Sequence, residues 1–174
     1  MSLPSDEYKN IVRKDRMNAA HLHITLVHLP VVLTPTATIL LAFALYRRQS
    51  TVSTVALALL VASTVLCVPA FLLGEGAEEI IEHLPGVSED LIEEHEEVAD
   101  IAFWLSVGLG AGSLALLALR TRAQNLYANG IKVALFLSII TSGALTYTAY
   151  EGGKIRHPEA YSDAPTSAEH EDKD

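Results

Sequence analysis

The chain has 174 residues, half of them apolar, and a formal net charge of −9. Its single cysteine, Cys67, excludes an intrachain disulfide, a paired-cysteine metal motif and the CxxCH sequence that attaches haem covalently. The acidic balance also disfavours nucleic acid as a partner, because phosphates require basic contacts. Apolar and acidic residues are segregated along the chain instead of being mixed as in a soluble domain, and this segregation indicates a membrane protein.

Four apolar runs follow a polar N-terminal segment, residues 1–20. Each run is long enough to cross a hydrocarbon core of about 30 Å, which takes roughly 20 helical residues. Short connections between the first and second runs and between the third and fourth make neighbouring runs antiparallel. We therefore predict an all-α integral membrane protein, an up-down-up-down four-helix transmembrane bundle within residues 21–157. The runs are residues 22–46, 52–74, 98–119 and 131–150.

Prolines and glycines inside the runs predict local features of the helices. Pro30 and Pro35 should kink the first helix. Gly108, Gly110 and Gly112 have the small-residue spacing that lets membrane helices approach closely, and we expect them to be packing glycines.

Two further segments lie outside the runs. The acidic loop, residues 75–97, should extend the second helix, turn at residues 84–86 and start a new helix near Ser88, which is a suitable N-cap. The last segment, residues 158–174, mixes proline, serine and acidic residues, so we expect a disordered tail.

Charges divide the protein into two sides. We call side A the side of both termini and the acidic loop, and side B the side of the connections 47–51 and 120–130. All 21 acidic residues and all seven histidines fall on side A or at its edge, whereas side B carries arginine without acid. The positive-inside rule then predicts that side A, with both termini and the histidines, faces outside, which is the periplasm if this is an inner-membrane protein of a Gram-negative bacterium. Four basic residues before the first run oppose this orientation: Lys9, Arg13, Lys14 and Arg16.

Histidines gather at the side A end. His28 lies six residues into the first run, roughly 9 Å deep, where an ionisable side chain is costly and is usually functional. The alternative is a neutral histidine bonded to a carbonyl of a neighbouring helix. His23 lies at the membrane edge and His95 opens the third run. His157 follows the fourth run by two turns if that helix continues through Arg156, so we expect the four histidines to converge.

Converging imidazoles suit a b-type haem, which takes one axial histidine on each face of the iron. We favour His28 paired with His95 or with His157, and His23 as a member of a second pair or as a substitute. Arg156 would meet the haem propionates. The sequence thus predicts a cytochrome b-like electron carrier or redox-complex subunit in the lipid bilayer, with cytochromes or quinol as partners. It favours such a carrier or subunit over a stand-alone enzyme.

Two alternatives remain open. A non-haem site for copper, zinc or iron could combine His28 and His95 with carboxylates such as Glu79 and Glu96, with His23 and His157 as further possible ligands. A cofactor-free scaffold or assembly subunit would instead use the histidines for hydrogen bonds between helices, and the acidic loop for docking a partner.

Three segments resemble a bacterial family of four-helix membrane proteins called domain of unknown function 2231. The family opening, His-Pro-x-Leu-Val-His-Phe-Pro, is similar to residues 23–30, with Ile24 in place of proline. His95 opens the third helix as the family histidine does. Residues 151–157 are similar to a closing Gly-Gly-Glu-x-x-Tyr-Arg-His-Gly, with Pro158 in place of the last glycine. The resemblance implies a four-histidine membrane bundle. The family occurs with cytochromes and Rieske-type domains, which favours a redox role.

Overall fold

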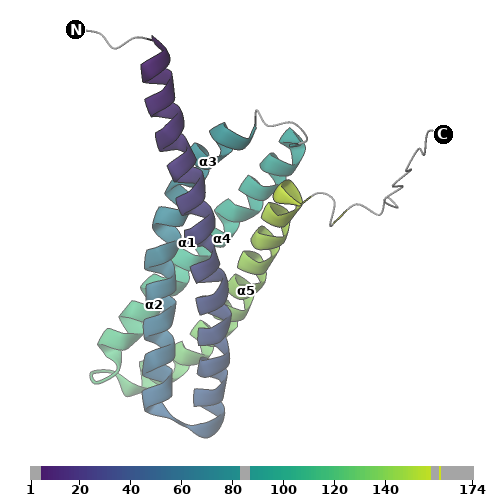
Figure 1. Cartoon of the computed structure of the whole chain (residues 1–174). Helices are drawn as coiled ribbons and strands as arrows, with labels where there is room; N and C mark the ends of the chain where they lie inside the picture. Colours follow the sequence, from purple (N-terminus) through teal and green to yellow (C-terminus); the bar gives the residue numbers. More distant parts are fainter. Residues whose placement is uncertain (1–4, 83–86, 158–160, 162–174) are drawn as a thin grey trace, which may run out of the picture.

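The chain forms five α-helices in the computed structural model, which describes residues 5–82, 87–157 and 161 (Figure 1). No strand occurs in the described residues. The turn predicted at residues 84–86 lies outside them, as does the predicted tail apart from residue 161. The helices are α1 (Ser5–Arg47), α2 (Ser50–Leu72), α3 (Gly74–Ile81), α4 (Glu89–Leu119) and α5 (Gln124–Arg156).

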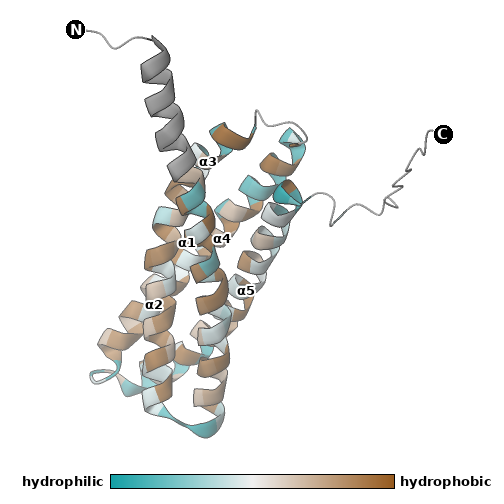
Figure 2. Ribbon diagram, viewed as in Figure 1, coloured by the Kyte–Doolittle hydropathy of each residue, from teal (hydrophilic) through white to brown (hydrophobic). Residues whose placement is uncertain are grey.

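Four of the helical stretches are long and apolar enough to cross a membrane: α1 from Ala19, α2 continued by α3, α4, and α5. Figure 2 shows apolar residues along the bundle and hydrophilic residues concentrated towards its ends. Many large apolar side chains face outwards, including Val32, Ile39, Trp104 and Phe136. A water-soluble monomer rarely exposes so much apolar surface, whereas a lipid bilayer solvates it. The predicted all-α transmembrane bundle is confirmed.

The four spanning helices form a ring. Helix α1 packs against α2 and α5, and α4 also packs against α2 and α5. Each helix is therefore antiparallel to both of its neighbours, and α1 and α4 lie diagonally across the bundle (Figure 1). Helix α3 follows a turn at Leu73 and packs against α1, where a Cβ added to Gly76 would lie 3.4 Å from Ala19 Cβ.

The interior contains an apolar core in the half nearer side B and hydroxyl contacts between helices. The apolar core includes Leu41, Leu57 and Leu60, and it is completed by Ala37, Ala56, Leu109, Ile131 and Ala134. Thr34 Oγ1 lies 2.7 Å from Ser63 Oγ, and the Thr64 hydroxyl donates to the Ser106 carbonyl at 2.7 Å. These contacts link α1 to α2 and α2 to α4.

Helices α4 and α5 extend beyond the apolar runs on side A. Helix α4 begins directly after Ser88, whose extended backbone (φ −96°, ψ 129°) is that of an N-cap residue, as predicted. Helix α5 continues through Arg156. This continuation is the condition under which we expected His157 to converge with the other histidines. Helix α1 continues through Pro30 and Pro35, so neither proline ends it.

Candidate functional site

His23 turns from α1 into the bundle near side A. The ring is half-buried, and its Nδ1 atom lies 2.7 Å from the Ala70 carbonyl oxygen on α2. Because a carbonyl oxygen only accepts, Nδ1 carries the proton in this contact, and a neutral ring keeps its lone pair on Nε2. The ring also lies beside Gly74, where an added Cβ would be 3.7 Å from its Cε1 atom.

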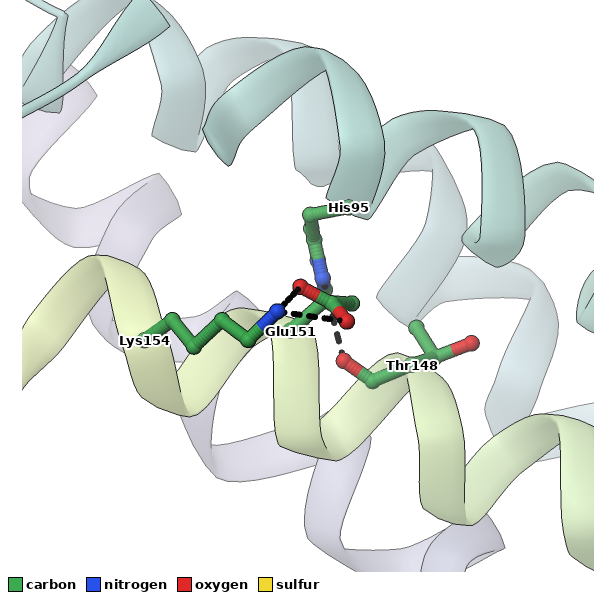
Figure 3. Close-up of polar contacts among 4 residues, drawn as sticks. All are labelled: His95, Thr148, Glu151 and Lys154. Atoms are coloured by element: carbon green, nitrogen blue, oxygen red, sulfur yellow. Dashed lines mark hydrogen bonds and ion pairs between the residues drawn. The ribbon is translucent and has the colours of Figure 1, made fainter. Parts of the chain in front are cut away.

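His95 repeats this arrangement from α4. Its half-buried ring places Nδ1 3.1 Å from the Thr148 carbonyl oxygen on α5 (Figure 3). The same argument assigns the proton to Nδ1 and leaves the Nε2 lone pair available. A Cβ added at Gly152 would lie 3.1 Å from His95 Cε1, closer than ordinary side-chain contact. Glycine at position 152 therefore makes room for the imidazole.

His23 and His95 form the centre of the candidate site. They come from the two diagonal helices α1 and α4, and each is tied to one of the other two helices. Both rings lie at the side A end of the membrane-spanning stretches of their helices. The structure thus brings together two inward-facing imidazoles at the side A end of the bundle.

Glu151 is a site residue that the sequence reasoning missed. Its side chain is buried, with 1% exposed, next to His95 (Figure 3). The Lys154 ammonium lies 3.0 Å from Glu151 Oε1 and 2.7 Å from Oε2, which compensates the charge of the carboxylate. Thr148, Glu151 and Ile155 share one helical face by their spacing, and this spacing is the signal that could have identified Glu151.

His28 lies on the outward face of α1. It is exposed, and its Nδ1 atom is 2.5 Å from the carbonyl oxygen of Ile24 in the same helix. Its neighbours on this face, Thr25, Leu29 and Val32, are exposed too. The inward position that we expected for His28 is therefore taken by His23.

The remaining predicted residues lie at the side A rim. Arg156 ends α5 with an exposed side chain, and the next residue, His157, donates its backbone N–H to the Gly153 carbonyl at 2.9 Å. Arg156 is thus an exposed cation two residues after Lys154. His157 is exposed as well, at the C-cap position of α5.

The predicted carboxylates lie on α3 and α4. Glu79 is exposed on α3, and Glu96 is exposed on α4. Among the side chains that the structure describes, no three His, Cys, Asp or Glu residues are grouped as a metal ion requires. The structure therefore does not group the ligands that we expected for a non-haem metal ion, His28, His95, Glu79 and Glu96.

One of three comparisons with known proteins gives a match. A family model described as "Predicted membrane protein (DUF2231)" matches residues 19–159, which is most of the chain. No curated protein and no solved structure matches it.

Proposed function

We propose a redox function for this chain, which belongs to the DUF2231 family of predicted membrane proteins. In this proposal the chain binds haem b between His23 and His95 and serves as a membrane electron carrier or redox-complex subunit. The observation that supports it most is the matched pair of Nδ1–carbonyl contacts, to Ala70 and to Thr148.

The donor chemistry fits a haem better than a bare metal ion. A porphyrin supplies four nitrogens, so the protein has to supply only two axial ligands, whereas an isolated ion needs a larger protein set. The described side chains offer no group of three for such an ion. A hydrogen bond from Nδ1 to a carbonyl fixes the orientation of an imidazole and raises the basicity of its Nε2 atom. His23 and His95 both make this bond.

The other residues of the site would have supporting roles. Arg156, exposed at the end of α5, would pair with a propionate, while Lys154 is already paired with Glu151. A bound haem would supply one-electron chemistry. The chain itself would hold the axial rings and bury the centre between four helices.

The location limits the electron exchange to one side. Helix α4 continues from His95 to Leu119, so its side B end lies roughly 36 Å away at 1.5 Å per residue. One site at side A would therefore exchange electrons with quinol or cytochromes on that side and would not conduct across the bilayer. Side B carries arginine and no acid, which supports a periplasmic side A in the inner membrane.

A cofactor-free scaffold is the second candidate, and the same contacts favour it. The bond from His23 to Ala70 joins α1 to α2, and the bond from His95 to Thr148 joins α4 to α5. Polar bonds between membrane helices contribute about 0.6–2 kcal/mol each, so they stabilise a bundle without any ligand.

Optical spectra of the detergent-purified protein separate the two candidates. Oxidised and dithionite-reduced spectra are recorded, and haem and metal contents are determined on the same sample. A sharp reduced α band with about one haem per chain supports the cytochrome. A colourless, haem-free protein from cells well supplied with haem contradicts it. Bound copper, zinc or iron in that sample would then favour the non-haem site, and their absence would favour the scaffold.

A further inference from the structure

His28 faces outwards from a membrane-spanning helix, and the proposed redox site does not use it. It lies six residues into the first apolar run, roughly 9 Å deep, in the stretch of α1 that is able to span a membrane. Ionisable side chains at such depths are rare and almost always face the interior of a bundle or a water-filled cavity. The exposed position of His28 therefore indicates a polar partner outside this chain.

The His28 ring keeps one nitrogen without a partner. Its Nδ1 atom lies 2.5 Å from the Ile24 carbonyl oxygen, so Nδ1 carries the proton and Nε2 keeps its lone pair. Within the described residues, Nε2 makes no hydrogen bond. Hydrocarbon supplies no donor, so an acceptor that faces lipid loses the hydrogen bond that it would make in water. A partner that fits this face must bring an O–H or N–H group to the depth of the ring.

Thr25 provides such a donor on the same outward face. It lies three residues before His28 and is also exposed, so the two side chains are neighbours on the helix surface. The Thr25 hydroxyl donates to the His21 carbonyl at 2.8 Å, and this carbonyl also accepts the backbone N–H of Thr25 in the helix. The hydroxyl hydrogen can therefore turn to another acceptor without leaving the carbonyl unbonded. One face of α1 thus carries a donor and an acceptor less than one turn apart.

A second copy of the chain is the occupant that satisfies both groups at once. Two copies inserted in the same direction can pair about a two-fold axis along the membrane normal, which places equal depths of the two α1 helices opposite each other. The His28 ring leans back along α1 to the Ile24 carbonyl, so it lies near the depth of Thr25. In such a pair Thr25 of each copy would meet His28 of the other, and the same contact would form twice.

We infer that the outward face of α1 is the interface of a parallel homodimer. The Thr25 hydroxyl of each copy donates to the His28 Nε2 atom of the other copy. The exposed side chains of Leu29, Val32 and Ile39 pack around these two bonds. Hydrogen bonds between membrane helices stabilise their association, and in the dimer the imidazole no longer faces lipid.

Energy transfer between donor-labelled and acceptor-labelled full chains in liposomes tests this inference, because its dependence on the protein-to-lipid ratio gives the dimer dissociation constant. We expect His28→Leu and Thr25→Val each to raise this constant about 10- to 300-fold, since either change removes both hydrogen bonds. The double variant should dissociate no more readily than the single variants, because all three lose the same two bonds.

The matched control is Thr146→Val on α5. The exposed Thr146 hydroxyl also donates at 2.8 Å to a carbonyl four residues earlier in its own helix, but it lies on a different helix from His28. This variant should keep the dissociation constant of the wild type.

Three results would overturn the inference. One is a wild type that stays monomeric at the highest protein-to-lipid ratio; binding of decylubiquinol by this monomer but not by His28→Leu would then assign the face to a quinol. Another is a dimer that Thr25→Val and His28→Leu weaken no more than Thr146→Val does. The third is an additive loss in the double variant, because Thr25 and His28 would then not bond each other. If His28→Leu does not fold, as circular dichroism would show, Thr25→Val decides the matter.

Discussion

His23 and His95 lie on diagonally opposite helices, and each places its Nδ1 atom on a backbone carbonyl of a different neighbouring helix. The bundle therefore holds both rings before any ligand binds, and each neutral ring keeps its Nε2 lone pair. This geometry connects the packing of the membrane domain to the proposed redox site, since the contacts that join the helices would also orient the two proposed haem ligands.

Gly110 should be essential for the packing of α2 against α4. A Cβ at this position collides with Thr64, whose hydroxyl bonds the Ser106 carbonyl. We expect Gly110→Ala to lower the free energy of unfolding by about 1–3 kcal/mol, the usual effect of overpacking. Thermal unfolding in detergent measures this, with Gly143→Ala as the control in open space. Equal stability of the two variants would contradict the packing described for α2 and α4.

The Glu151–Lys154 pair should behave as a partly buried ion pair. Glu151 is 1% exposed and Lys154 is 24% exposed. We expect Lys154→Met to lower the free energy of unfolding, by less than the loss of a fully buried pair, because Lys154 is partly solvated. Adding Glu151→Gln should restore most of this loss, since no uncompensated carboxylate remains. A double-mutant cycle measures the coupling, and purely additive effects would refute the pairing.

Arg156 should affect the proposed haem without being a ligand. Replacing Arg156 with glutamine removes the exposed cation at the end of α5. If this cation pairs with a propionate, haem content should fall or the reduction potential should shift to a lower value, while the α band keeps its position. A spectroelectrochemical titration measures both quantities. An Arg156→Gln protein with the potential and haem content of the wild type would exclude this role.

The fold was predictable because the bilayer imposes length and hydropathy on each spanning helix. The helical start after Ser88 was also predictable, because it depends on local backbone preferences. The sequence could not predict that Gly110 serves internal packing while Gly108 and Gly112 stay open. That difference depends on which face of α4 meets α2.

The candidate site was predicted only in part, because depth in the membrane does not define which way a helix faces. His23 and His28 are five residues apart, roughly 140° around a helix, so only one of them turns inwards. The buried stripe of α1 passes through Pro30, Thr34 and Ala37. Extended back by seven residues, about two turns, this stripe reaches His23 and misses His28. The rotation of α1 thus assigns the inward position to His23.

The most direct test of the account is the haem content and reduced optical spectrum of three histidine variants purified in parallel with the wild type. His23→Ala and His95→Ala should lose the haem and its low-spin α band, whereas His28→Ala should retain both. Circular dichroism of each variant controls for folding. Loss of haem in His28→Ala with retention in His23→Ala would contradict the assigned pair, and a haem-free wild type would contradict the cytochrome itself.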